Sequence, residues 1–177
     1  AALRQHIAQR LRQRMAEGGV LGQQVELDMA LLQHAAQQQA RLQALWAYGN
    51  EPVKGGAQIS AAIYSQEPVD TDGGGSHPVR LIFRDHPDWG RSSYLVLEAG
   101  DFDCYGGCRL KVIADGKTHT LPGSRPKTDD AIAMFVEDHK RLWKLAKESK
   151  QLSIEFPTKA VGRKTAEFEV GGLEPDK

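Results

Sequence analysis

The chain has 177 residues, 40% hydrophobic and 26% charged, and its 23 basic residues balance its 23 acidic ones. A net charge of zero argues against a dedicated nucleic-acid-binding protein, which normally carries a basic excess. No apolar run approaches the roughly 18 residues of a transmembrane helix. The start at Ala1 shows no apolar leader stretch, and we read it as a mature or trimmed chain, which leaves room for a signal or anchor already removed.

The first 50 residues have the pattern of two helices. Leu3, Ile7, Leu11 and Met15 recur every four residues, as on one face of a helix, until two glycines at 18–19 break the pattern. A second helical run is expected from about residue 23 to 48. We interpret residues 1–50 as a helical hairpin. Its apolar seam either packs on its own domain, docks another chain, or spaces the domain from a membrane anchor.

Residues 51–177 have the texture of a β-rich domain. The pair Asp115-Gly116 is a typical two-residue hairpin turn, and Asp138 is placed to cap a short helix with Leu142, Leu145 and Ala146 on its buried face. The stretch 131–136 fits either a helix or a strand. Strands are expected at 59–64, 79–84, 93–98, 102–104, 108–114, 117–121, 152–156 and 166–170.

This order of elements predicts an α+β fold. An N-terminal helical hairpin is followed by an antiparallel domain that is either sandwich-like or a strongly curved sheet. One short helix lies near the C-terminus. The predicted boundary separates residues 1–50 from residues 51–177.

Both cysteines of the chain lie in one short stretch, with Cys104 and Cys108 on either side of a glycine pair. A zinc site needs four ligands, and a thioredoxin-like pair has two intervening residues rather than three. A glycine turn would bring the two cysteines opposite one another, near the roughly 5.5 Å between Cα atoms that a disulfide tolerates. We therefore favour a disulfide, with free buried thiols as the main alternative. A disulfide indicates an oxidising compartment.

Several short motifs follow one another between residues 79 and 173. They are Asp88-Trp89-Gly90-Arg91, Cys104-Tyr105-Gly106-Gly107-Cys108, Asp115-Gly116, Met134-Phe135-Val136-Glu137-Asp138, the run 142–146, Ile154-Glu155-Phe156, and Phe168-Glu169-Val170-Gly171-Gly172-Leu173. In the order and spacing of these motifs, the stretch resembles a small β-rich domain found in exported proteins of Gram-negative bacteria. The resemblance implies that the stretch around Phe135 is a strand, that the lysine-rich helix packs on the sheet, and that no catalytic residues are inherited. Some such domains accompany secretion systems.

One cluster has the residue types of an active site. Asp85, His86 and Asp88 combine two carboxylates with an imidazole, which is chemistry suited to a hydrolase. The same residue types also make an ordinary surface turn, and we favour that interpretation. We expect no catalytic residues, no metal and no cofactor. The lysines of 140–150 are interpreted as a solvated helix face.

The leading hypothesis is a non-enzymatic periplasmic protein, anchored to a membrane only if a lipid anchor preceded this sequence. It would bind another protein as an inhibitor or immunity protein that neutralises a toxin. A secretion-system accessory and a hydrolase are the alternatives. Aromatic residues and arginine dominate protein interfaces, so Trp89, Arg91 and Tyr105 are predicted to form the partner-binding rim.

Overall fold

The computed structural model describes residues 2–15, 18–127 and 132–174. The chain divides into two compact units, residues 1–40 and 41–177. The second unit begins at Arg41, whereas the sequence analysis places the boundary after residue 50. Trp46 explains the difference, because its side chain is buried and its ring lies 6.2 Å from that of Phe83. Residues just after 40 therefore contribute to the core of the β-rich unit.

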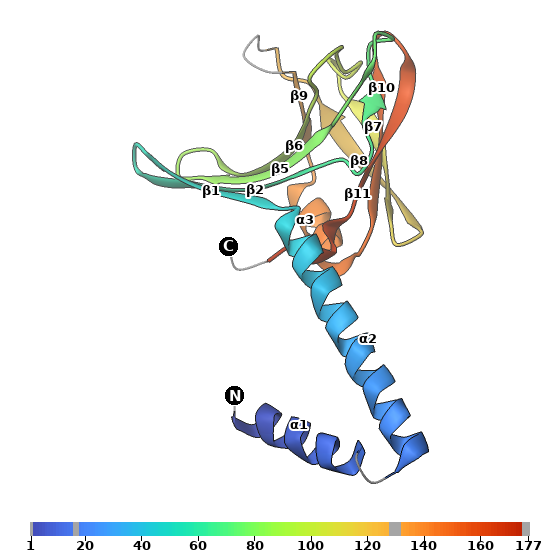
Figure 1. Cartoon of the computed structure of the whole chain (residues 1–177). Helices are drawn as coiled ribbons and strands as arrows, with labels where there is room; N and C mark the ends of the chain where they lie inside the picture. Colours follow the sequence, from blue (N-terminus) through green and yellow to red (C-terminus); the bar gives the residue numbers. More distant parts are fainter. Residues whose placement is uncertain (1, 16–17, 128–131, 175–177) are drawn as a thin grey trace. The chain divides into compact units, whose positions relative to one another are not determined.

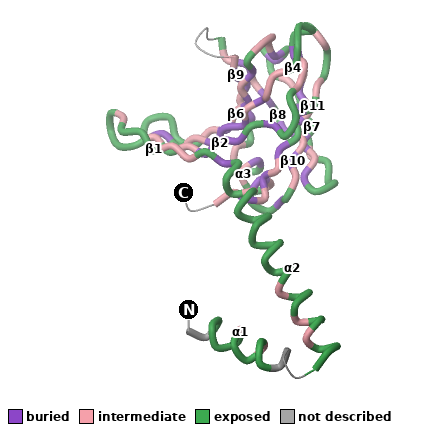
Figure 2. Tube along the Cα trace, viewed as in Figure 1, coloured by how far each residue is buried: buried purple, intermediate pink, exposed green. Residues whose placement is uncertain are grey.

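The first unit consists of helix α1 (Ala2–Met15) and most of helix α2 (Gly19–Ala44). The predicted break between them is confirmed, since α2 starts at the second glycine of the pair. Among the described residues, none of α2 is buried, and Figure 2 shows the helix as mostly exposed. A packed helical seam is therefore not confirmed. No helix in the described ranges is long and apolar enough to cross a membrane.

The second unit is built on one antiparallel sheet of nine strands (Figure 1). Its spatial order is β1-β2-β5-β6-β9-β8-β7-β10-β11, and a separate two-stranded ribbon pairs β3 with β4. The strands are β1 (Ala47–Val53), β2 (Gly56–Tyr64), β3 (Val69–Asp70), β4 (Ser76–His77), β5 (Arg80–His86), β6 (Gly90–Val96), β7 (Cys108–Ala114), β8 (Lys117–Ser124), β9 (Ala133–Val136), β10 (Leu152–Thr158) and β11 (Gly162–Phe168).

The sheet curves so strongly that its edge strand β11 approaches the chain just after β2, near the opposite edge. Just after β2, the Gln66 amide donates to the Glu167 carbonyl oxygen on β11 at 2.7 Å. The inward side chains make one continuous core that includes Leu81, Leu95 and Leu121, all fully buried. A single curved sheet is thus the architecture, and two stacked sheets are not confirmed. The α+β class, with helices first and an antiparallel sheet after them, is confirmed.

Helix α3 (His139–Glu148) packs on the core side of the sheet (Figure 1). Its predicted start is confirmed, because Asp138 accepts a hydrogen bond from the Arg141 amide at 3.2 Å. Leu142 and Ala146 are fully buried, and the Trp143 ring meets Phe83 edge-on at 5.0 Å. A short 3₁₀ turn, η1 (Val170–Gly172), follows β11.

Two strand predictions differ from the structure. The helical run ends earlier than expected, and β1 occupies residues predicted to terminate the helix. Gly49 permits this strand to pair closely with β2, because a Cβ there would lie 2.5 Å from the Ser60 hydroxyl oxygen. The expected strand at 102–104 is reduced to one bridge between Phe102 and Thr158. The stretch around Phe135 is strand β9.

Candidate functional site

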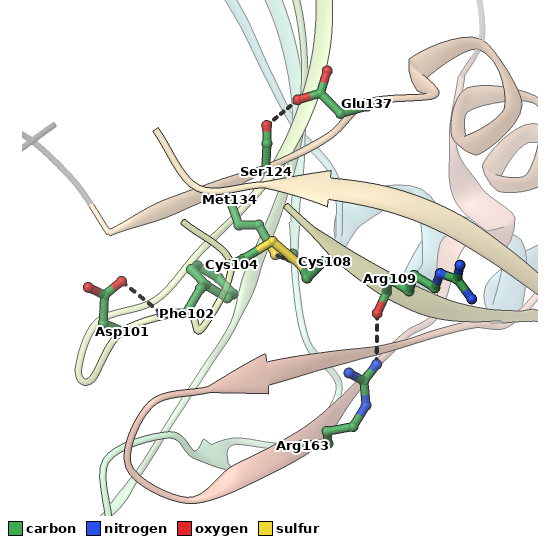
Figure 3. The surroundings of a disulfide bond; sticks show 9 residues. All are labelled: Asp101, Phe102, Cys104, Cys108, Arg109, Ser124, Met134, Glu137 and Arg163. Carbon is green, nitrogen blue, oxygen red and sulfur yellow. Dashed lines mark hydrogen bonds between the residues drawn. A yellow bond between two sulfur atoms is a disulfide. The ribbon is translucent and has the colours of Figure 1, made fainter. Parts of the chain in front are cut away.

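The glycine turn between the cysteines is closed by a disulfide, as predicted. Cys104 and Cys108 are bonded with their Cα atoms 5.1 Å apart. The Gly107 amide donates to the Cys104 carbonyl oxygen, and Gly107 adopts φ of +92°, which side-chain-bearing residues rarely take. Figure 3 shows the bridge beside Met134, whose sulfur lies 3.8 Å from that of Cys108. The bridge fixes the start of β7 against its neighbours.

An ion pair that is buried on its arginine side also holds this loop. Arg125 has a side chain only 4% exposed, and its Nε donates to Asp101 at 2.9 Å. The backbone amide of Arg125 also donates to the Cys104 carbonyl oxygen. Burial alone would raise the pKa of Asp101, but hydrogen bonds from Arg125, Tyr105 and the Phe102 amide outweigh it and hold that pKa below its ordinary 3.8.

Tyr105 belongs to this network rather than standing free. Its hydroxyl donates to Asp101 at 2.9 Å. The Lys159 ammonium lies 4.2 Å from the ring centroid, and the Arg125 guanidinium lies 5.3 Å from it. The side chain is 41% exposed, so one edge faces solvent. The Tyr105 hydroxyl and ring therefore already interact with residues of the same domain.

Trp89 lies in the turn between β5 and β6 and is 69% exposed. Its ring stacks on His86 with centroids 3.9 Å apart and planes 16° from parallel. His86 is buried beneath it, and its Nδ1 accepts a hydrogen bond from the Asp88 amide. Trp89 is therefore held in place by this stacking while most of its surface faces solvent.

The structure does not bring the predicted rim together. Arg91 shares the hairpin with Trp89 and pairs with Asp85 at 3.3 Å, with both side chains well exposed. Tyr105 comes after the opposite end of β6, and that strand of seven residues spans roughly 20 Å at about 3.3 Å per residue. Trp89 and Tyr105 thus define two separate surfaces.

The cluster considered for hydrolysis is also divided. Asp85 and His86 are neighbours on β5, so their side chains project to opposite faces of the sheet. The described residues contain no group of three histidine, cysteine, aspartate or glutamate side chains arranged to hold a metal. His139 reaches the Ser93 hydroxyl at 3.3 Å, but Ser93 is fully buried and closed to a substrate. Burial, followed by the charge of Arg91, lowers the pKa of His139.

A surface that the sequence analysis did not identify extends from Trp89 along β5. Leu81 and Phe83 point into the core, so Arg80 and Arg84 lie on the opposite, outer face of the strand. The Arg84 guanidinium lies 5.3 Å from the Trp89 ring centroid and 5.2 Å from that of Tyr94. We call the group Tyr64, Arg80, Arg84, Trp89 and Tyr94 the arginine–aromatic surface.

The rest of this surface repeats the same pairing. The Arg80 guanidinium lies 5.6 Å from the ring centroid of Tyr64, which is 54% exposed. Ile82, between the two arginines, is only 8% exposed although it points away from the main core. The signal was present in the sequence, because arginines two positions on either side of an isoleucine must share one face of a strand.

Helix α3 presents the basic residues that the sequence assigned to a solvated face. Lys140, Lys144 and Lys147 are all exposed. The Lys147 ammonium lies 5.7 Å from the Trp143 ring centroid, and Arg141 contacts His119 at 3.0 Å. Both contacts join residues of the same domain, so we base no binding site on this helix face.

Comparison with known proteins gives no match, whether to a family model, to a curated protein or to a solved structure. The resemblance to exported Gram-negative domains therefore stays a prediction. Any function has to be argued from the surfaces described above.

Proposed function

We propose that this chain is a non-enzymatic periplasmic protein that acts by binding another protein, as an inhibitor or immunity protein that neutralises a toxin. Trp89 is the observation that carries the proposal. A large aromatic side chain, 69% exposed, is held rigidly by stacking on His86 and by the neighbouring Arg84. Tryptophan is enriched among binding hot spots, and a side chain that is already ordered loses little entropy when it is covered.

The compartment is proposed from the disulfide. Cys104 and Cys108 form a bridge that would be short-lived in a reducing cytosol and stable in an oxidising periplasm. Thiol alkylation of freshly isolated native protein tests this. We expect no alkylated cysteine without reductant, whereas two reactive thiols would contradict the periplasmic assignment.

The helical first unit is proposed as a hairpin spacer that holds the binding domain away from an anchor or a second chain. Leu27, Leu31 and Leu32 of α2 are 61%, 68% and 72% exposed. Leucines of a helix that packs on its own domain are usually buried. Limited proteolysis of the full chain tests the spacer. Cleavage is expected within residues 1–40 while the rest stays intact. Protection of that segment in the isolated protein would contradict it.

Capture from periplasmic extract tests the binding function. The full chain is used as bait beside two variants, Trp89→Ala and Tyr105→Ala, under conditions where circular dichroism shows all three folded. We expect a stoichiometric partner that is lost with Trp89→Ala and kept with Tyr105→Ala. Inhibition of that partner's toxic activity by the wild-type chain supports the immunity role. A partner equally captured by Trp89→Ala contradicts the proposed site.

A further inference from the structure

The arginine–aromatic surface contains polar atoms that find no partner within the described residues. The Nε atoms of Arg80 and Arg84 are buried without a hydrogen bond, and so is the Ser92 hydroxyl, which lies opposite Arg84 on the adjacent strand. Buried donors left unpaired raise the free energy of the free protein, so nearly all such groups in native structures find a partner. These three atoms are closed to solvent, so a ligand would meet each arginine at its terminal Nη atoms instead.

Neither arginine is neutralised in the part of the chain that the structure describes. The ion pairs found there use Arg41, Arg91, Arg125, Lys159 and Arg163. Arg80 and Arg84 instead rest against the faces of Tyr64, Tyr94 and Trp89. A guanidinium stacked on a ring keeps its N–H edge available, which is the geometry that binds a carboxylate through two parallel hydrogen bonds.

The spacing of the two arginines sets the shape of the ligand. They are four residues apart on the same face of β5, about 13 Å at roughly 3.3 Å per residue. Two carboxylates four residues apart in an extended chain have the same separation. A short apolar residue midway between them would lie over Ile82, whose side chain is already buried and offers no hydrogen bond.

Resting on the proposed binding function, we infer that the partner contacts this surface through an extended acidic segment, with one carboxylate on Arg80 and another on Arg84. Trp89 then covers the end of that segment. A nucleic acid is the less suitable ligand, because the chain has no net positive charge and phosphate binding depends on many cations.

The test uses a synthetic peptide, Thr-Glu-Thr-Val-Thr-Glu-Thr, titrated into the full-length protein. Side-chain Nε–H and indole N–H signals are followed by NMR. A matched peptide with glutamine in place of glutamate is the first control, and hexathymidylate is the second. We expect saturable shifts of the Arg80, Arg84 and Trp89 signals with the glutamate peptide, and affinity at least tenfold lower for the glutamine peptide.

Variants then test the two-hydrogen-bond geometry. Arg80→Lys combined with Arg84→Lys keeps the charge but removes the planar fork, and we expect at least fivefold weaker binding of the glutamate peptide. Arg109→Lys, at an exposed position on β7, is the matched control and should change nothing.

Three results would overturn the inference: no saturable shift, equal binding of the glutamine peptide, or tighter binding of hexathymidylate. The proposed function is tested separately by protein capture. If capture still depends on Trp89 while the glutamate peptide fails, only the acidic segment is wrong.

Discussion

Two turns of this domain carry an exposed aromatic ring, and they use it differently. In the loop at 101–108, Tyr105 donates to Asp101 and lies between Lys159 and Arg125, so its polar and aromatic groups are engaged by its own domain. In the turn between β5 and β6, Trp89 stacks on His86 and lies 5.3 Å from the Arg84 guanidinium, yet 69% of it stays exposed, against 41% of Tyr105. From the sequence alone, both are predicted to belong to one rim. The difference shows that exposure alone does not mark a binding residue. What matters is which interactions the residue still has to offer.

The largest expected effect comes from removing the ion pair beneath Tyr105. Arg125→Met leaves Asp101 without its main side-chain partner, while the backbone amide at position 125 still donates to the Cys104 carbonyl oxygen. We expect the free energy of unfolding, measured in urea, to fall by about 3 kcal/mol, as for other broken buried pairs. Arg91→Met is the control, because its ion pair is largely exposed and should contribute less than about 1 kcal/mol. If both variants lose the same free energy of unfolding, the two ion pairs contribute equally and the two turns do not differ in this respect.

Removing the disulfide should have the next largest effect. The loop between Cys104 and Cys108 is short, so the double change to serine should cost about 2 kcal/mol, less than the roughly 3 kcal/mol of a 15-residue loop. The measurement is urea unfolding of the double-serine variant beside the wild type. If unfolding is unchanged, the Asp101 network holds the loop without help from the bridge.

A smaller effect is expected for the Tyr105 hydroxyl alone. Tyr105→Phe keeps the ring between its two cations and loses one hydrogen bond to Asp101, which should cost about 1 kcal/mol. Trp89→Phe is the matched change in the other turn, and we expect less than about 0.5 kcal/mol because surface substitutions rarely exceed that. Thermal and urea unfolding of both variants provide the measurement. If Trp89→Phe loses more free energy of unfolding than Tyr105→Phe, then Trp89, and not Tyr105, is the ring that stabilises its own domain.

The smallest effect is a dependence of stability on acid. Because the folded state lowers the pKa of Asp101 below 3.8, its contribution is present above pH 3.8 and is lost as the pH falls through that value toward the folded pKa. The free energy of unfolding is measured in a series of unfolding curves between pH 5 and 2. In Asp101→Asn, it should fall less steeply with decreasing pH than in the wild type. If the loss of stability in acid is the same in that variant, other carboxylates cause it.

Local features of the fold were predictable from the sequence. The pair Asp115-Gly116 forms its hairpin turn with φ of +46° and +85°, and β7 has the predicted bounds. Asp138 caps α3, and the cysteines are bonded. Each of these depends on residues within a few positions of one another, where turn, capping and ring-closure chemistry act.

The order of the strands and the contacts of the arginine–aromatic surface across strands were not predictable in the same way. β9 lies between β6 and β8, and β10 lies beside β7, and these neighbours come from distant parts of the chain. Arg84 lies against Tyr94, which is placed on the next strand by the register of β5 with β6. The contacts of Tyr105 with Arg125 and Lys159 were not predictable either, because both residues reach it from elsewhere in the sequence.

The difference between the two turns is tested most directly by calorimetric titration with the captured partner. Trp89→Ala should weaken binding by about 2 kcal/mol or more, which is roughly 30-fold. Tyr105→Ala, compared at a temperature where it remains folded, should bind as the wild type does. Loss of affinity with Tyr105→Ala and none with Trp89→Ala would contradict the account and move the binding site to the disulfide loop.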